Sequence, residues 1–284
     1  MNTFNNAFGK IDYTLTNDYM FRAVMQENET VLKGLVSSLL HLDFSDIRSV
    51  TILNPIALGK AFDEKTFVLD IKVLLNNAMV INLEMQVAGQ DFWNDRSLIY
   101  LCNIFNNLKS GDDYSHVMPA CHIGILDFTP FPEQPEFYAT NKMMNVRKHY
   151  VYNDKFTLNV LDLRQIDMAT DEDKAYKLDY WARLFKARTW EDLRMIAHDD
   201  DILEQTCETM YNLNQDEVTR YWCEAREDGL RIMRTIQNQY KAAIAEKESA
   251  LAQKDNIIVQ KDSIIEQLQA EIQKLKEASG KEVN

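Results

Sequence analysis

TFVLDIKVLLNNAMVINLEMQV, residues 66–87, is the stretch of sequence that decides the fold. Apolar and polar side chains alternate through both of its halves, and this period of two indicates two β-strands with one buried face each. Asn76 and Asn77 separate the halves and indicate a turn, because asparagine tolerates the left-handed conformation. The stretch therefore predicts a β-hairpin.

The faces of the two strands fix the length of the loop. Residues opposite each other in an antiparallel pair share a face, so a loop of even length would mix apolar with polar side chains. A three-residue loop of 76–78 keeps all the apolar side chains together. The polar face then carries these opposite pairs: Asp70 with Glu84, Lys72 with Asn82, and Val68 with Gln86.

The pairing of Asp70 with Glu84 has a chemical consequence. Two carboxylates placed so have Cβ atoms roughly 5 Å apart, and like charges at that separation are destabilising. A hard divalent cation bound by oxygen ligands neutralises them. An exposed acidic face on which Lys72 screens both carboxylates explains the same pattern, and the residues alone leave both interpretations open.

An Asp on one strand followed by Glu-x-Lys or Glu-x-Gln on the next is the core motif of the PD-(D/E)XK nuclease superfamily. The chain resembles its Rpn (recombination-promoting nuclease, transposase-like) branch over most of residues 12–165. The resembling segments are NDYMFRAVM (17–25), LDIKVLLNN (69–77), INLEMQV (81–87), RSLIY (96–100), GDDYSHVMPACHIGILDF (111–128) and FTLNVLDL (156–163).

The resemblance implies an α/β fold, a restriction-endonuclease-like mixed sheet flanked by helices. It implies Mg²⁺ or Mn²⁺ as the cofactor and Asp70, Glu84 and Gln86 as the catalytic residues. The metal ligands would be Asp70, Glu84, the main-chain carbonyl of Met85 and Asp18 on the first helix. Asn17 or Asp18 could cap this helix, so an N-cap is an equally good explanation of Asp18. Gln86 occupies the position of the commoner lysine, and an amide cannot act as a general base.

Substrate-binding residues are predicted around the same site. Arg96 and Tyr100 match the family's Arg-x3-Tyr and begin a polar stripe on a helix expected over 91–108, where Arg96 can bind a phosphate. A pairing of Arg96 with Asp91 or Asp95 is the structural alternative. Lys72 is expected to supply the positive charge that Gln86 lacks. Asp63 and Glu64, just before the hairpin, fit either the metal site or a solvated loop.

The sequence predicts three regions: a nuclease-like domain over 1–165, a helical extension over 166–228 and a coiled-coil tail over 229–284. In the first, helices are expected within 12–41, strands at 47–54, 117–128 and 156–165, and a proline-rich loop after 128. Ile244 begins a heptad series in the tail that continues as Leu251, Ile258, Ile265 and Ile272. With these residues at heptad position a, position d holds Lys247, Lys254, Lys261, Leu268 and Leu275. Isoleucine at a with leucine at d favours a parallel homodimer through 229–279, whereas the lysines at d weaken its N-terminal part and Ile257 and Ile264 at g leave the number of strands open. A helix wrapped on its own domain is the alternative.

Composition limits the kinds of partner. The net charge is −13, and residues 1–128, 129–228 and 229–284 hold 9, 13 and 9 basic against 15, 21 and 8 acidic residues. No region has a basic surplus large enough for an electrostatic footprint on DNA, so nucleic-acid contacts must rest on local patches. The four cysteines lack CxxC spacing and read as reduced thiols. We expect a cytoplasmic protein without a signal peptide or a membrane span.

Two functions remain in competition at this stage. The first is a metal-dependent DNA endonuclease that hydrolyses phosphodiester bonds and is linked by resemblance to recombination or mobile elements. The second is an inactive nuclease-fold binding module assembled through its coiled coil. The set Asp70, Glu84 and Gln86 favours the first, and the acidic surface and the missing lysine at 86 favour the second.

Overall fold

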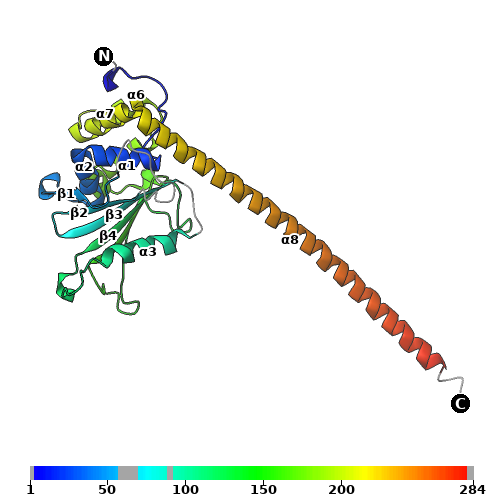
Figure 1. The fold of residues 1–284 in the computed structure, drawn as a ribbon. Helices are drawn as coiled ribbons and strands as arrows, with labels where there is room; N and C mark the ends of the chain where they lie inside the picture. Colours follow the sequence, from blue (N-terminus) through cyan, green and yellow to red (C-terminus); the bar gives the residue numbers. More distant parts are fainter. Residues whose placement is uncertain (1–2, 57–69, 88–91, 280–284) are drawn as a thin grey trace. The chain divides into compact units, whose positions relative to one another are not determined.

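A computed structural model describes residues 3–56, 70–87 and 92–279 (Figure 1). The chain divides into two compact units, residues 1–227 and residues 228–284. The first unit is an α/β domain, and the second is the continuation of one long C-terminal helix.

A six-stranded mixed sheet in the order β1-β2-β3-β4-β6-β5 forms the centre of the first unit. Its strands are β1 (Val50–Ile52), β2 (Ile71–Leu75), β3 (Met79–Gln86), β4 (Ala120–Leu126), β5 (Tyr138–Lys142) and β6 (Phe156–Asp162). The β1–β2, β2–β3 and β5–β6 pairs are antiparallel, whereas β3–β4 and β4–β6 are parallel. The predicted mixed α/β fold is therefore confirmed.

The β2–β3 hairpin has the register predicted from the alternation of its side chains. Leu75 lies opposite Met79 and Lys72 opposite Asn82, so the loop contains three residues. Asn76 and Asn77 both have positive φ angles, 51° and 54°. The side-chain oxygen of Asn76 also accepts hydrogen bonds from the main-chain N–H groups of residues 48 and 49, which fixes the turn against the segment before β1.

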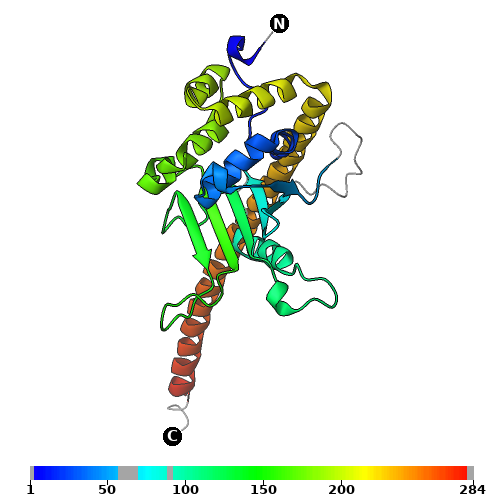
Figure 2. The ribbon, with the colours of Figure 1, turned by 90° about the vertical axis from the view of Figure 1, so that its left-hand side faces the viewer.

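Helices cover both faces of the sheet (Figure 2). The helices of the unit are α1 (Asp18–Glu27), α2 (Glu29–Leu40), α3 (Trp93–Phe105), α4 (Asp171–Ala175), α5 (Leu178–Lys186), α6 (Trp190–Ala197) and α7 (Asp201–Gln215), with short 3₁₀ turns η1 (Phe4–Asn6), η2 (Phe44–Asp46), η4 (Tyr114–His116) and η5 (Ile166–Met168). Helices α1, α2, α5, α6 and α7 contribute to the larger core, on the sheet face that carries Ile71, Ile81 and Leu83. Helix α3 packs on the opposite face through Trp93, Leu101 and Ile104.

Most of the expected elements are present with shifted ends, and one strand was missed. The predicted strand over 47–54 is only three residues long, and the helix expected over 91–108 is α3, whose described part begins at Trp93. Strand β5 follows the proline-rich loop and has no counterpart among the sequence predictions. It is an edge strand whose side chains are largely exposed, so its sequence, YATNK, lacks the alternation that marks a half-buried strand.

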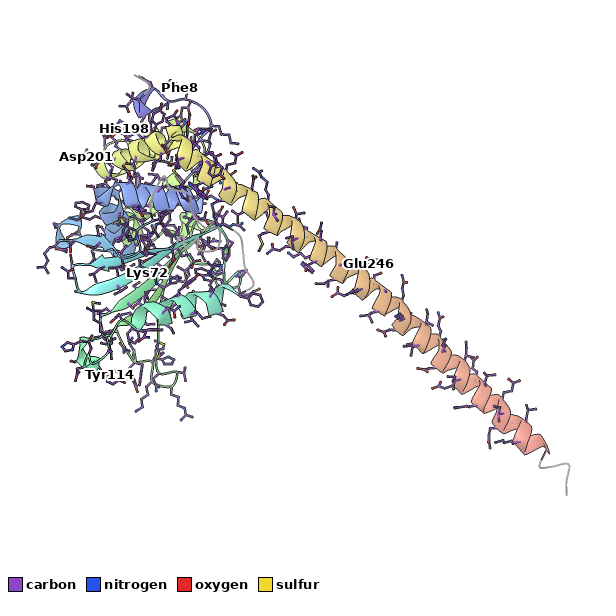
Figure 3. All side chains as sticks on the ribbon, viewed as in Figure 1. Phe8, Lys72, Tyr114, His198, Asp201 and Glu246 are labelled. Carbon is purple, nitrogen blue, oxygen red and sulfur yellow. The ribbon has the colours of Figure 1, made fainter. Side chains whose placement is uncertain are left out.

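Helix α8 runs from Glu217 to Ser279 without interruption. Within residues 228–279 the heptad positions Ile244, Leu251, Ile258, Ile265 and Ile272 are each at least half exposed. Side chains project around the helix along its length, as Figure 3 shows near Glu246. The predicted helix is confirmed, and its assembly with a second copy stays a prediction. No described helix combines the length and the apolar composition that crossing a membrane requires.

Candidate active site

Asp70 and Glu84 lie on the α3 side of the sheet, at the point where β2 and β3 meet. Continuing the register that pairs Ile71 with Leu83 by one residue places Asp70 opposite Glu84, as the sequence predicts. Both side chains are buried, with 7% and 4% of their surface exposed. Lys72 and Asn82 form the next pair on the same face, and Figure 3 labels Lys72 on β2.

Glu84 is the more perturbed of the two carboxylates. Its Oε1 lies 2.5 Å from Nη2 of Arg96 on α3. Burial raises the pKa of Glu84 to about 7, with the negative charges of Asp70 and Asp18 adding to the rise and Arg96 opposing it. Burial also raises the pKa of Asp70, and Lys72 and Arg22 oppose that rise. A bound cation would therefore reduce the electrostatic cost of keeping both carboxylates ionised.

The raised pKa of Glu84 predicts a pH dependence of stability in the metal-free protein. The folded state binds this proton more tightly than the unfolded state, whose glutamate titrates near its ordinary value. Glu84 therefore contributes full stability below about pH 4.5, and this contribution is lost as the pH rises through about 7. The loss is up to about 3 kcal/mol. Urea unfolding of the wild type and Glu84→Gln from pH 5 to 8 in EDTA measures it, and parallel pH profiles would contradict the assignment.

Arg22 and Asn54 hold the main chain at Asp70. Arg22 is fully buried one turn after the start of α1, and its guanidinium donates to the carbonyl oxygens of Asp70 and Asn54. The Asn54 amide donates to the same Asp70 carbonyl at 3.0 Å and accepts from the Lys72 N–H at 2.8 Å. A buried arginine in the first helix thus fixes the position of the candidate carboxylate, a role that sequence reasoning missed.

Asp18 is not the N-cap of α1. That position belongs to Asn17, whose side-chain oxygen accepts from the N–H groups of Tyr19 and Met20. The carboxylate of Asp18 instead forms a two-pronged ion pair with Arg226 of α8, with Nε 3.0 Å from Oδ1. Its charge contributes to the raised pKa of Glu84, so Asp18 belongs to the same electrostatic environment.

His122 on β4 lies beside Glu84 and has no assigned role in the sequence predictions. It is fully buried, its Nδ1 lies 3.1 Å from the Asn82 amide nitrogen, and its Nε2 lies 3.7 Å from Glu84 Oε2. Burial lowers the pKa of His122 to about 3, so the imidazole is neutral at neutral pH. The signal that would have found it is the parallel β3–β4 register, which places Asn82 beside His122 and cannot be read from one strand alone.

Gly124 positions α3 over the site. It lies beside Glu84 in the β3–β4 register, and a Cβ atom at Gly124 would lie 2.4 Å from two ring carbons of Trp93. Trp93 is buried against this glycine and stands one turn before Arg96. The absence of a side chain at Gly124 therefore lets α3 approach closely enough for Arg96 to reach Glu84.

Gly124→Ala is expected to lower the free energy of unfolding by about 1–3 kcal/mol, because the rigid Trp93 ring must move. Gly229→Ala is the matched control, since nothing lies within 4 Å of its added methyl group and alanine favours a helix interior. Urea unfolding followed by tryptophan fluorescence checks both. Equal stability of Gly124→Ala and wild type would show that α3 is not held at this distance.

The remaining candidates divide between those that the structure brings together and those it does not describe. The Arg96 guanidinium lies 5.3 Å from the centre of the Tyr100 ring, which stacks on His122 with ring centres 5.8 Å apart. Arg96 pairs with Glu84, a partner that neither sequence alternative included. The Met85 side chain packs into the larger core, which leaves its carbonyl as the candidate ligand. Asp63, Glu64 and Asp91 lie outside the described residues.

The donor set at this site fits a hard divalent cation. Asp70 Oδ2 and Glu84 Oε2 are buried and accept no hydrogen bond from the described part of the chain. Within that part, no cluster of three or more His, Cys, Asp or Glu side chains is arranged to bind a metal ion. Magnesium commonly takes one or two carboxylates and completes its shell with water and substrate phosphate. Two carboxylates with unpartnered oxygens are consistent with that mode of binding.

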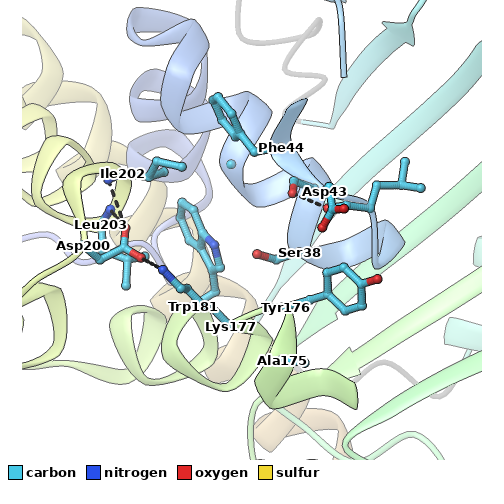
Figure 4. A pocket seen from close by; sticks show the side chains of 13 residues that line it. Ser38, Asp43, Phe44, Ala175, Tyr176, Lys177, Trp181, Asp200, Ile202 and Leu203 are labelled. Carbon is cyan, nitrogen blue, oxygen red and sulfur yellow. Dashed lines mark hydrogen bonds and ion pairs between the residues drawn. The ribbon is translucent and has the colours of Figure 1, made fainter. Parts of the chain in front are cut away.

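Apart from the candidate active site, a hollow of about 170 Å³ lies between the C-terminal end of α2 and the segment from α4 to α7 (Figure 4). Two of its charged side chains, Asp200 and Lys177, are paired with each other. Asp200 accepts from the N–H groups of Ile202 and Leu203 at the start of α7, and it pairs with Lys177 at 2.5 Å. These contacts stabilise helix ends, so this hollow adds nothing to the candidate active site.

A mixed sheet with acidic side chains on neighbouring hairpin strands, flanked by helices on both faces, is the arrangement expected of the nuclease fold that the sequence resembles. The chain belongs to the PD-(D/E)XK nuclease family transposases, whose family model matches residues 15–237. This match confirms the resemblance to the Rpn branch. No curated protein and no solved structure matched the chain significantly.

Proposed function

We propose that this chain is a Mg²⁺- or Mn²⁺-dependent DNA endonuclease that hydrolyses phosphodiester bonds. The observation that carries the proposal is the buried pair Asp70 and Glu84, placed opposite each other with unpartnered oxygens. Family membership supports the nuclease chemistry and DNA as the substrate. The family description also supports a link to recombination or mobile elements.

The proposed roles of the residues follow from their positions. Asp70, Glu84, the carbonyl of Met85 and Asp18 would hold the cation, which when bound polarises a phosphodiester oxygen and acidifies a water molecule. Gln86 orients the attacking water or a phosphate oxygen through its amide, since it has no proton-accepting group of suitable strength. Lys72, on the same face as Asp70, contributes the positive charge that the family's commoner lysine supplies.

Two of the candidate metal ligands form ion pairs with arginines, and these arginines could bind the substrate. Arg96 pairs with Glu84 and Arg226 pairs with Asp18. A cation bound by these carboxylates would compete with both guanidinium groups. Arg96, about one-third exposed and in contact with the Tyr100 ring, could then bind a DNA phosphate in place of Glu84. We propose Arg96, Tyr100 and Lys72 as the substrate-binding residues.

Nicking of supercoiled plasmid DNA tests the proposal. Purified wild-type chain is incubated with plasmid in Mg²⁺, in Mn²⁺ and in EDTA, alongside Glu84→Ala prepared identically. Cleavage by the wild type that needs the metal and is absent in Glu84→Ala supports the endonuclease. Equal product from both proteins would indicate a contaminating nuclease and would overturn it.

The alternative is an inactive nuclease-fold module assembled through its helix. Two observations favour it: Gln86 replaces lysine, and the net charge of −13 opposes general attraction to DNA. Calorimetric titration with Mg²⁺ separates the two functions before any cleavage assay. An inactive module predicts no heat of binding that depends on Asp70 and Glu84.

A further inference from the structure

A hairpin tip between β5 and β6 stands apart from the rest of the molecule in its charge. Residues 142–155 contain four basic residues (Lys142, Arg147, Lys148 and Lys155) and a single acidic one, in a chain with a net charge of −13. We define the β5–β6 tip as residues 143–152. Among the segments that join adjacent strands of the described sheet, it is the only one with more basic than acidic residues.

The β5–β6 tip also exposes apolar and aromatic side chains that a surface loop ordinarily avoids. Tyr152 and Val146 are 72% and 82% exposed, and four further side chains of the tip are at least 38% exposed. Within the described part of the chain, Arg147 and Lys148 take part in no ion pair. Basic side chains interleaved with exposed aromatic rings are the chemistry by which proteins contact phosphates and sugar or base surfaces.

The tip is held in a defined shape. Met144 and Val151 form an antiparallel bridge, and the Tyr152 N–H donates to the Met143 carbonyl at 2.8 Å. The Asn145 side-chain oxygen accepts from the N–H groups of Arg147 and Lys148 at 3.0 and 2.9 Å. These bonds fix the turn through main-chain atoms, so the two basic side chains are left to extend into solvent.

The base of the tip lies on the same sheet face as the candidate active site. Lys142 and Met143 line an apolar groove of about 360 Å³ together with Trp93 and Leu98 of α3. Glu84 lies beside Gly124, which pairs with Val160 and through it with Ala139, three residues from Lys142. Lys142 is thus three strands away from Glu84 across the sheet and three residues further along β5. Together these offsets place the two residues roughly 17 Å apart in the plane of the sheet.

We propose that the β5–β6 tip is a DNA-contacting element that binds the duplex backbone beside the site of cleavage. Arg147 and Lys148 neutralise phosphates, while Tyr150 and Tyr152 pack against sugar and base surfaces. The separation of roughly 17 Å ends at Lys142, at the base of the tip, and corresponds to about five base pairs at about 3.4 Å per phosphate along one strand. Arg147 and Lys148 lie further along the hairpin, so they would bind phosphates more than about five base pairs from a phosphate at Glu84. This inference rests on the proposed function for the identity of the ligand.

Binding measured without cleavage tests the inference separately from the chemistry. Fluorescence anisotropy of a labelled 20-base-pair duplex is followed in EDTA, at several salt concentrations, for the wild type and for Arg147→Ala/Lys148→Ala. Because alanine keeps the main-chain N–H groups that Asn145 binds, the tip should remain folded. We expect at least about a tenfold rise in Kd, and a fall of about 1.8 in the slope of log K against log salt, since two phosphate contacts are lost.

Lys10→Ala/Lys174→Ala is the matched control, because it also removes two positive charges from exposed positions of the same unit. We expect its Kd within about twofold of the wild type, as for surface charges remote from a ligand. Tyr150→Ala/Tyr152→Ala should weaken binding while leaving the salt slope unchanged. Binding by the tip variant equal to wild type, an equal loss in the control, or no wild-type binding at low salt would each overturn the inference. Binding through the tip without metal-dependent nicking would overturn the proposed cleavage alone.

Discussion

Replacing Glu84 by alanine is expected to lower the rate of Mg²⁺-dependent plasmid nicking by at least about 1,000-fold. Stabilisation of a phosphoryl transition state by a bound cation amounts to several kcal/mol, and each 1.36 kcal/mol is a factor of ten in rate. Glu84 is buried opposite Asp70, so its loss removes half of the carboxylate pair that is proposed to hold the cation. Initial rates of nicking at saturating Mg²⁺ measure the effect.

The fold should survive this substitution, which makes the loss of activity interpretable. An ionised Glu84 is costly in the metal-free protein, because burial and the charge of Asp70 raise its pKa to about 7. Arg96 loses its contact with Glu84, but its side chain is 35% exposed and can be hydrated. We expect the melting temperature of Glu84→Ala in EDTA to equal or exceed that of the wild type at pH 8. Raising the melting temperature with Mg²⁺ should succeed only in the wild type.

Asn94→Ala is a suitable comparison, because it alters helix α3, next to Trp93, without changing a candidate ligand. It should nick plasmid at a rate within a few-fold of the wild type. If Glu84→Ala nicked as fast as Asn94→Ala, the carboxylate pair would have no part in the reaction, whatever the stability measurements showed.

The hairpin could be predicted from sequence because the residues that determine it are adjacent along the chain. The alternation in residues 66–87 excludes a loop of even length, and the three-residue loop at 76–78 fixes the pairing of Lys72 with Asn82. The polar face opposite the larger core follows from the same alternation. The α/β class and the helical nature of the tail are likewise carried by periodicity within single segments.

The surroundings of the two carboxylates could not be predicted, because they depend on segments distant in the sequence. Arg22 reaches Asp70 across 48 residues, His122 reaches Asn82 across 40, and Arg226 reaches Asp18 across 208. Each contact depends on strand order or helix packing, which one strand's pattern does not contain. Arg96 was expected near the site, but its pairing with Glu84 depends on how closely Gly124 lets α3 approach.

Disrupting the heptad of α8 is expected to have the second large effect, on assembly. The double variant Ile265→Lys/Leu268→Lys places charges at one a and one d position of the proposed parallel dimer. Both side chains are about half exposed in the single chain, so a partner helix is needed to bury them. Burial of each such side chain contributes about 1.5–3 kcal/mol, and the dimer contains four of them. We therefore expect the dimer Kd to rise at least about 1,000-fold, as measured by sedimentation equilibrium.

Replacing lysines at the d positions by leucine should strengthen the dimer rather than weaken it. Lys254 and Lys261 occupy positions where two parallel helices would face each other with like charges, and an acidic residue follows each of them at e. Lys254→Leu/Lys261→Leu should therefore tighten the dimer and raise the melting temperature of the helix. Tightening by the leucine pair together with dissociation by the lysine pair identifies this stripe as the interface. A monomeric wild-type chain would instead favour a helix that serves another partner.

The direction of the two helices decides what assembly does for cleavage. In a parallel dimer, Ile258→Cys lies beside its own copy and forms a disulfide on oxidation, whereas an antiparallel pair aligned out of register separates the two residues. Exposed Cys102 is replaced by serine in this experiment, because it is the exposed thiol among the described cysteines. A parallel dimer would join two copies of the proposed nuclease unit at the same end, so two strands of one duplex could be cut together. The Ile265→Lys/Leu268→Lys variant should then keep single-strand nicking and lose linearisation of plasmid. An unchanged ratio of linear to nicked product would show that each site acts alone.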